Sequence, residues 1–320
     1  MSKSQKTAPE RVSLIGAPTD VGAGRRGSSM GPEALRVAGL HKMLRGLGME
    51  VVDRGDLIGP LNPEEKPVNG YRNLKEVAAW NGLVRDAMYE ALKDGDFPIL
   101  MGGDHCLAVG SIAGVAKHCH EAGKSLSVLW LDAHADFNTP DTSPSGNIHG
   151  MPIACLAGHG PKELTGLGHA VPILDPTNVI QVGIRSVDAA EKELVAENGL
   201  TVYDMRQIDE HGMRRVMDMA LAKAAEAGGH MHVSFDVDFL DPSIAPGVPT
   251  TVPGGPNYRE AQLCMEMIYD SGLTCSLDIM ELNPAFDRGN MTAELAVELV
   301  SSLFGEQTLA RTHSNRKYSL

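Results

Sequence analysis

Aromatic side chains and positive charge are both scarce in this chain of 320 residues. Aromatic residues make up 4% of the sequence, whereas glycine occurs 35 times. This balance favours a tightly turned α/β fold over an aromatic-rich β-sandwich. The formal net charge of −13 argues against nucleic acid as a partner, because binding to phosphates calls for a clustered basic surface. An acidic surface mildly favours a cationic small molecule, although many acidic proteins simply use their charge for solubility.

Paired cysteines and long apolar runs are also missing. The five cysteines are Cys106, Cys119, Cys155, Cys264 and Cys275, an odd number without close metal-type spacing. Reduced, buried thiols in a cytoplasmic protein fit this pattern best. The polar start of the chain has no apolar signal core, and no stretch approaches the roughly 20 apolar residues that span a bilayer. We therefore expect a cytoplasmic protein with no membrane partner and about ten flexible residues at its start.

Short β-rich runs alternate with helical patterns along the whole chain. The predicted strands are 12–15, 50–53, 97–101, 127–132, 179–183, 201–204, 232–235 and 275–279. The predicted helices are 32–47, 74–93, 105–122, 188–198, 206–226, 257–271 and 291–304. Such alternation predicts a mostly parallel sheet with helices on both faces. No shift in composition marks a boundary, so we predict one domain over residues 1–320.

Four apolar strands are each followed by acidic or histidine residues. These segments are Pro98–His105, Val128–Asp136, His232–Asp238 and Ser276–Glu281. In open parallel sheets, ligands bind beyond the carboxyl ends of the strands. The four segments can therefore converge in space, although they span most of the chain.

Carboxylates and imidazoles at alternate positions predict a metal centre. A lone aspartate after a strand is more often a cap or a turn residue, but here two clusters and a third histidine occur together. The predicted ligands are His105, Asp132, His134, Asp136, Asp236 and Asp238. Oxygen and nitrogen ligands without thiolates suit Mn²⁺ or a related divalent ion. Six ligands are too many for one structural zinc site and suit two ions that share carboxylates and activate a water molecule.

Two further residues have open interpretations from the sequence alone. Glu281 is equally compatible with a buried salt bridge and with a site residue. His149 lies in the loop Ser145–Gly150, where it either moves protons between the site and solvent or is satisfied by the loop backbone.

These motifs together resemble the ureohydrolase family, which includes arginases and agmatinases. The matching segments are Gly102–His105, Asp132–Asp136, Ser234–Asp238 and Asp278–Glu281, and the similarity covers nearly the whole chain. The resemblance implies a three-layer α/β/α fold around a central, mostly parallel sheet of about eight strands. It also implies a homo-oligomer, either a trimer or a hexamer.

The arginase branch fits better than the agmatinase branch. The run Asn138–Pro140, the following Ser145–Pro152, and the segments Ile15–Asp20, Gly24–Gly27 and Gly31–Arg36 resemble bacterial arginases. The implied reaction is hydrolysis of the guanidinium of L-arginine to L-ornithine and urea through a metal-bridging hydroxide. The implied cofactors are two Mn²⁺ per subunit, with Co²⁺, Ni²⁺ or Fe²⁺ as alternatives. Another amidine hydrolase of the same family, acting on agmatine, a guanidino acid or formimidoglutamate, remains an alternative, as does a non-catalytic arginine-binding protein.

The resemblance also implies a role for each matching residue. His105 and Asp136 would bind the first ion, His134 and Asp238 the second, and Asp132 and Asp236 both. Glu281 would pair with the substrate guanidinium, Asp136 would carry the proton to the leaving nitrogen, and His149 would relay protons to solvent. The remaining substrate contacts would be Asn138, Ser145 and Asn147 at the α-carboxylate, Asp188 and Glu191 near the α-amino group, and Thr250 in the guanidinium pocket.

One position departs from the pattern of the family. Pro249 stands where arginases usually carry glycine, directly before Thr250. Proline fixes φ near −65° and removes an amide donor, whereas glycine can adopt conformations that proline cannot. The geometry of the guanidinium pocket is therefore the least predictable part of the site.

Overall fold

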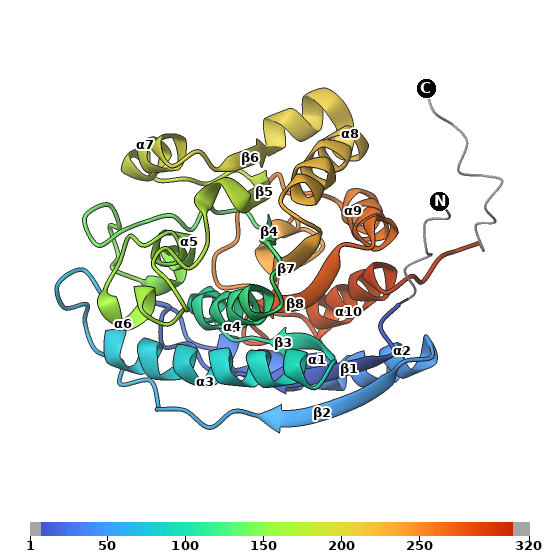
Figure 1. Cartoon of the computed structure of the whole chain (residues 1–320), viewed down its shortest axis with the longest axis horizontal. Coiled ribbons are helices and arrows are strands. Elements are labelled where there is room, and N and C mark those ends of the chain that lie inside the picture. The colour runs from blue at the N-terminus through green and yellow to red at the C-terminus, as the bar shows by residue number, and fades with distance from the viewer. Residues whose placement is uncertain (1–7, 310–320) are drawn as a thin grey trace.

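A single eight-stranded parallel sheet forms the centre of the protein. The computed structural model describes residues 8–309, and its strands lie in the order β2-β1-β3-β8-β7-β4-β5-β6 (Figure 1). Their bounds are β1 Arg11–Gly16, β2 Glu50–Asp56, β3 Phe97–Met101, β4 Leu126–Leu131, β5 Val179–Ile184, β6 Thr201–Asp204, β7 His230–Asp236 and β8 Thr274–Met280. Every neighbouring pair is parallel. The predicted fold class and all eight predicted strands are confirmed.

Helices cover both faces of the sheet. Helices α1 Gly31–Val37, α2 Leu40–Gly46, α8 Met205–Glu226, α9 Tyr258–Ser271 and α10 Met291–Leu303 contribute to the apolar core on one face. Helices α3 Leu74–Lys93, α4 Ala108–Glu121, α5 Pro152–Leu156 and α6 Lys162–Thr165 contribute to the core on the other face, against which α7 Ala189–Glu197 also packs. The order of layers is therefore helix, sheet, helix.

The helix prediction was wrong in three places, one of which is Gly212, whose non-helical conformation (φ 79°, ψ 150°) divides α8 at a kink. The predicted helix 32–47 is two helices, because Gly39 takes a left-handed conformation (φ 88°) between α1 and α2. Helices α5 and α6 were not predicted, since each spans five residues or fewer and so shows no full helical repeat. Their buried side chains nevertheless complete the core beside α4.

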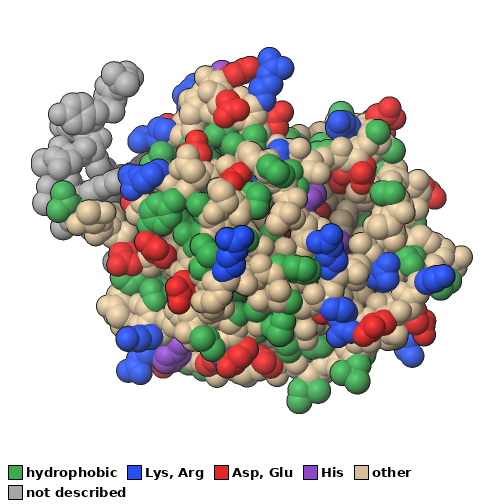
Figure 2. All heavy atoms as spheres, turned by 180° about the vertical axis from the view of Figure 1, so that it is seen from behind, with side chains coloured by type: hydrophobic (Ala, Val, Ile, Leu, Met, Phe, Trp, Pro, Cys, Tyr) green, Lys and Arg blue, Asp and Glu red, His purple; other side chains and the backbone are tan. Residues whose placement is uncertain are grey.

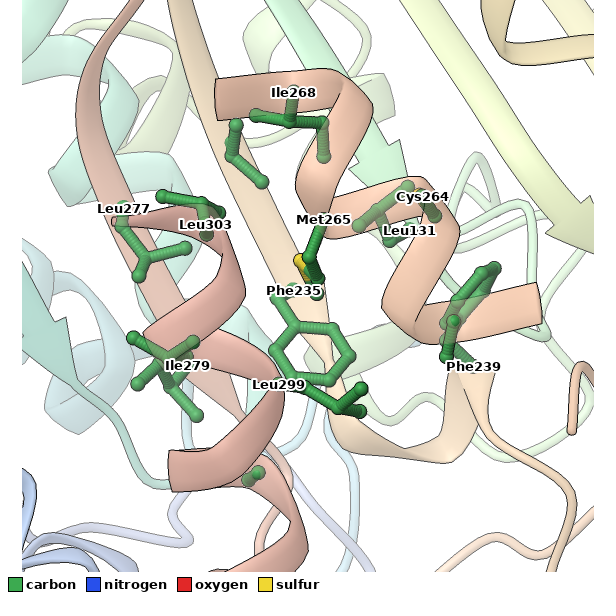
Figure 3. Close-up of a cluster of buried hydrophobic side chains, with 14 of the residues drawn as sticks. Leu131, Phe235, Phe239, Cys264, Met265, Ile268, Leu277, Ile279, Leu299 and Leu303 are labelled. Carbon is green, nitrogen blue, oxygen red and sulfur yellow. The ribbon is translucent and has the colours of Figure 1, made fainter. Parts of the chain in front are cut away.

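The core between the sheet and helices α9 and α10 is formed by large aliphatic and aromatic side chains. Phe235 of β7 and Ile279 of β8 point towards Met265 of α9 and Leu299 of α10 (Figure 3). All four side chains are fully buried. Burying each such side chain stabilises the fold by about 1.5–3 kcal/mol relative to leaving it exposed.

Helices α3 and α4 approach each other unusually closely on the opposite face. A Cβ atom added at Gly110 would lie 2.2 Å from the backbone oxygen of Asn81, so a larger residue has no room there. The Gly110 amide also donates to Asn81 Oδ1 at 2.6 Å. This close pairing fixes the start of α4, which follows the 3₁₀ turn His105–Leu107.

The order of strands brings the four predicted site segments together. Strands β3, β8, β7 and β4 are consecutive neighbours at the middle of the sheet, and each precedes one of these segments. Because all strands are parallel, their carboxyl ends meet at one edge. Segments that are far apart in the sequence therefore lie side by side.

Other sequence predictions concern the ends of the chain and the cysteines. No helix in residues 8–309 is long and apolar enough to cross a membrane. The cysteines of this range are free, and four of them are buried while Cys275 is partly buried. The predicted flexible start falls mostly on residues 1–7, which lie outside the described part.

A buried carboxylate ties the amino-terminal strand to the turn before β3. Asp96 accepts hydrogen bonds from the Ser13 hydroxyl at 2.5 Å and from the Arg54 guanidinium at 3.0 Å, and it also pairs with Arg11. Its side chain is 1% exposed. Burial raises the pKa of Asp96, but the bonds from Ser13, Arg11 and Arg54 outweigh this effect and hold it below its usual value.

We predict that Asp96→Asn lowers the free energy of unfolding by about 1.5–3 kcal/mol, the usual contribution of hydrogen bonds to a charged group. Since the folded-state pKa is lowered, the stabilisation is present above pH ~4 and disappears as the pH falls through the folded-state value. Urea unfolding at neutral and acid pH measures the difference. Asp86→Asn is the control, because Asp86 is exposed and its ion pair in the described part of the chain is with the neighbouring Arg85. Equal stabilities of the two variants at neutral pH would contradict the prediction.

Candidate active site

A pocket opens at the carboxyl edge of the sheet, where the four segments meet. Its volume is about 290 Å³, close to the lower end of the range for small-molecule sites. Figure 2 shows a hollow with histidine side chains in it on one face of the molecule. The lining residues are His105, His134, Asp136, Asn138, Ser143, Pro144, Ser145, Asn147, His149, Gly150, Ser186, Asp188, Glu191, Asp236, Asp238, Thr250 and Glu281.

His105 is held in place by its own loop. A Cβ atom at Gly103 would lie 1.7 Å from the Thr19 carbonyl oxygen, so glycine is required for the loop to pass. Asp104 then begins a 3₁₀ turn by accepting from the Cys106 amide. The loop therefore directs the His105 ring beneath the pocket.

Contacts of both ring nitrogens and of the ring face define the orientation of His105. Its Nε2 lies 2.8 Å from Ser234 Oγ, and its ring stacks on Trp130 with centroids 4.1 Å apart. Its Nδ1 faces three carboxylates, 3.0 Å from Asp236, 3.1 Å from Asp132 and 3.3 Å from Asp136. This nitrogen is the atom available to a metal ion.

Asp132 is shared by two groups of potential metal ligands. One group is His105, Asp132 and Asp136, and the other is Asp132, His134 and Asp238. The Asp132 side chain is fully buried, and its Oδ2 accepts from Trp130 Nε1 at 2.8 Å. His134 Nδ1 lies 3.4 Å from Asp132 and 3.1 Å from Asp238. The predicted metal ligands are thus brought together, with Asp236 beside the first group.

The electrostatics of the cluster favour a cation. Burial and the negative charge of Asp132 raise the pKa of Asp136 well above its usual value, and burial and the charge of Asp238 do the same for Asp236. Burial alone would lower the pKa of His105, but its bond to Asp132 and the surrounding carboxylates raise it to about 9. Carboxylates packed this closely without bulk water need positive charge among them. The oxygen atoms of these carboxylates and the nitrogen atoms of the histidines are the ligand set that suits Mn²⁺ and similar ions.

Two site residues adopt a backbone conformation that is unusual for their type. Asp136 has φ 50° and Glu281 has φ 61°, both in the left-handed region. Such residues cost about 1–3 kcal/mol each and persist only where the surroundings enforce them. At Glu281, the backbone amide donates to the Gly103 carbonyl at 2.9 Å, which fixes the end of β8 against the His105 loop.

Glu281 and His149 form a direct pair in the pocket. Glu281 Oε1 lies 2.8 Å from His149 Nδ1 and also accepts from the His105 amide at 2.8 Å. Burial raises the pKa of Glu281, but the charge of His149 and its hydrogen bond outweigh burial and lower it. Burial likewise lowers the pKa of His149, and Glu281 raises it overall. The Glu281 carboxylate is therefore ionised. Glu281 both forms a buried pair and lines the pocket, so the two interpretations from the sequence are compatible.

Neutral amides and two more carboxylates also line the pocket. Asn138 Nδ2 donates to Asp188 at 3.1 Å, while Asn138 Oδ1 accepts from the Thr142 hydroxyl at 2.9 Å. Glu191 is 3% exposed, and its two oxygens accept from the amides of Phe137 and Asp188. Glu191 thereby holds Asp188 at the start of α7 in a capping box.

The loop that contains Pro249 is held by contacts at this residue and at the next one. The Pro249 carbonyl accepts from Arg25 Nη1 at 2.9 Å, and the next residue, Thr250, donates its hydroxyl to Asp238 at 3.1 Å. Proline at this position is therefore compatible with a Thr250 side chain directed into the pocket.

Every predicted site residue lines the pocket except Asp132, which is buried behind it. Sequence reasoning missed four lining residues, namely Ser143, Pro144, Gly150 and Ser186. The first three lie in the glycine- and proline-rich loop that also carries His149. Ser186 follows the end of β5, just as the predicted aspartates follow the ends of their strands. The signal was therefore present, but serine after a strand is too common to indicate a site.

A family model, curated sequences and solved structures of known proteins all point to the same family. A family model described as the arginase family matches residues 10–305. The arginase of Brevibacillus brevis is 44% identical over 300 residues, covering 94% of this chain and 99% of the relative. The arginase of Brucella suis is 46% identical over 299 residues, covering 93% and 97%. The structure of Bacillus caldovelox arginase superposes with a TM-score of 0.89 at 43% identity, covering 94% of this chain and all of that one.

Removal of Asp132 should affect both groups of potential metal ligands. We predict that Asp132→Asn weakens Mn²⁺ binding more than roughly 100-fold at both groups, since even indirect partners of metal ligands contribute 10–100-fold. Asp238→Asn should weaken only the group that contains His134. Calorimetric titration of Mn²⁺ into metal-stripped protein measures both effects.

Asp188→Asn is the control for this titration, because Asp188 lines the same pocket outside both groups. It should leave the affinity for Mn²⁺ nearly unchanged. Identical Mn²⁺ binding by the Asp132 variant and the unmodified protein would contradict the assignment.

Proposed function

Because the chain belongs to the arginase family of hydrolases, we propose that it hydrolyses L-arginine to L-ornithine and urea. One observation carries the proposal. A cluster of potential metal ligands and the ionised Glu281 line the same pocket as Asn138, Asn147 and Asp188. L-Arginine has a group to match each set, a guanidinium and an amino-acid group.

The proposed cofactors are two divalent ions, with Mn²⁺ as the expected metal. His105 and Asp136 would hold one ion, His134 and Asp238 the other, and Asp132 and Asp236 would contact both. When bound, such ions lower the pKa of water, so that a strong nucleophile is present near neutral pH. The shared position of Asp132 and the dense carboxylate packing support this arrangement.

Glu281 is proposed to position the guanidinium. A guanidinium is a planar fork of donors that matches a carboxylate. Glu281 Oε1 already accepts from His105 and His149, whereas, within residues 8–309, Oε2 has one long contact of 3.4 Å from the Ser28 hydroxyl. Oε2 is therefore the atom with capacity for the substrate. Holding the guanidinium carbon in line with the attacking water lowers the entropic part of the barrier.

Proton movement is assigned to Asp136 and His149. Attack by water on the guanidinium carbon leaves a proton that must reach the departing side-chain nitrogen, because an amine leaves far more readily when protonated. Asp136 lines the pocket beside the cluster and is proposed to carry that proton. His149 has a side chain that is 16% exposed, so it can exchange protons with solvent from the pocket.

The amino-acid end of the substrate is proposed to bind the loop 138–147 and the start of α7. Asn138, Ser145 and Asn147 offer hydroxyl and amide donors to the α-carboxylate. Asp188 offers a carboxylate to the α-amino group. Because both oxygens of Glu191 accept backbone amides, its proposed contact with the substrate runs through water.

Assembly, location and domain organisation are also proposals. We infer a cytoplasmic homo-oligomer, a trimer or a hexamer, in which residues 1–320 act as one domain. The free cysteines and the match of the family model across residues 10–305 support this interpretation.

A panel of guanidino substrates tests the function. With added Mn²⁺, we expect urea from L-arginine and much less from agmatine, which lacks the α-carboxylate. Asn138→Ala should raise the KM for L-arginine about 10-fold or more, because a hydrogen bond to a charged group is lost. Colorimetric detection of urea provides the rates. Preference for agmatine, or an unchanged KM in the variant, would instead favour another amidine hydrolase.

His149→Asn should lower kcat by about 10²-fold or more, the usual contribution of a positioned proton-transfer group. Imidazole added to the buffer should restore part of the rate, because it replaces the missing ring as a proton carrier. The variant rate is measured across pH with and without imidazole. A rate that matches the unmodified enzyme at every pH would remove His149 from the proton path.

A further inference from the structure

Arg72 lies just outside the pocket, at the end of the segment that precedes α3, and the mechanism above does not use it. Its Nε donates to Asn147 Oδ1 at 2.6 Å. Its backbone amide donates to the Gly146 carbonyl at 2.8 Å, and its Nη1 donates to the Glu65 carbonyl at 3.0 Å. The guanidinium is thus fixed between Asn147 and the Glu65 carbonyl.

The contact with Arg72 determines which end of the Asn147 amide faces the substrate. Arginine has donors only, so the atom that meets it must be the amide oxygen. The other end, Nδ2, has no hydrogen-bond partner in the part of the chain that the structure describes, and Asn147 lines the pocket. The amide is therefore oriented with a donor left for a ligand.

Neighbouring glycines keep this arrangement open and rigid. A Cβ atom at Gly24 would lie 3.0 Å from Asn147 Nδ2, so the glycine leaves this donor uncovered. At Gly70, a Cβ atom would lie 2.6 Å from Pro140, which shows how tightly the segment before Arg72 packs on the pocket loop. The backbone that precedes Arg72 is therefore held against the pocket loop.

We propose that Arg72 is a positioning residue that gives the pocket its preference for substrates with an α-carboxylate. The inference rests on the proposed function. Without Arg72, the Asn147 amide is free to rotate by 180° and present its oxygen, which repels a carboxylate. Asn138 has a different restraint, because Asp188 and Thr142 hold its two ends from within the pocket region. Arg72 therefore controls one carboxylate contact independently of the other.

The test uses Arg72→Met, which keeps much of the side-chain length and removes every side-chain donor. We expect its KM for L-arginine to rise about 10- to 100-fold, the range for loss of a charge-assisted hydrogen bond, while kcat changes little. Arg72→Lys should recover part of the loss. Arg259→Met is the matched control, because Arg259 is exposed and, within residues 8–309, its side chain donates a hydrogen bond to Gln262 on the surface of α9.

A double-mutant cycle with Asn147→Ala separates positioning from a general structural role. If Arg72 acts through Asn147, adding Arg72→Met to Asn147→Ala should raise KM no further. The proposal would be overturned if the effects of the two substitutions on KM multiplied in the double variant. It would also be overturned if Arg72→Met lowered kcat and thermal stability in parallel.

Ligand binding supplies a readout that does not depend on turnover. Calorimetry should show that Arg72→Met loses affinity for L-ornithine but not for 1,4-diaminobutane, which differs only by lacking the carboxylate. Equal losses for both ligands would also overturn the proposal. If the unmodified protein releases no urea from L-arginine, the proposed function fails by itself. The same cycle is then run with the carboxylate-bearing substrate that the panel identifies.

Discussion

The packing of several buried carboxylates around shared Asp132 is the constraint on which the rest of the structure depends. Aspartates this close together repel one another, and burial removes the water that would screen them. The repulsion is offset locally by histidine nitrogens and by donors such as Trp130 Nε1. Divalent ions would replace this partial compensation with full neutralisation. The same concentration of charge that makes the cluster costly for folding makes it suitable for activating water.

The fold concentrates these charges by placing four consecutive strands at the middle of the sheet. Each strand ends at the same edge, and short loops hold the side chains in place. Where a loop must pass closely, glycine occurs, as at Gly103 beside Thr19. Where a side chain must turn into the pocket, the backbone adopts a costly conformation, as at Asp136 and Glu281. The tightly packed core on both faces of the sheet supplies the rigidity that maintains both features.

Two kinds of polar group line the pocket. The potential metal ligands and Glu281 supply carboxylates, which suit a cationic group. The Asp188 carboxylate lies beside the neutral amide of Asn138, and the orientations of the Asn138 and Asn147 amides are fixed by neighbouring residues. Neutral donors can receive an anionic carboxylate without adding another buried charge.

The sequence by itself determined the strands, the fold class and the potential metal ligands, because alternating patterns and aspartates after apolar strands are local features. Tertiary structure decided what depends on partners far along the chain. The short helices α5 and α6 exist because their apolar side chains complete a core. Glu281 became a partner of His149 only through a contact across 132 positions. The orientation of Asn147 likewise depends on Arg72, 75 positions earlier, and no local pattern encodes such a contact.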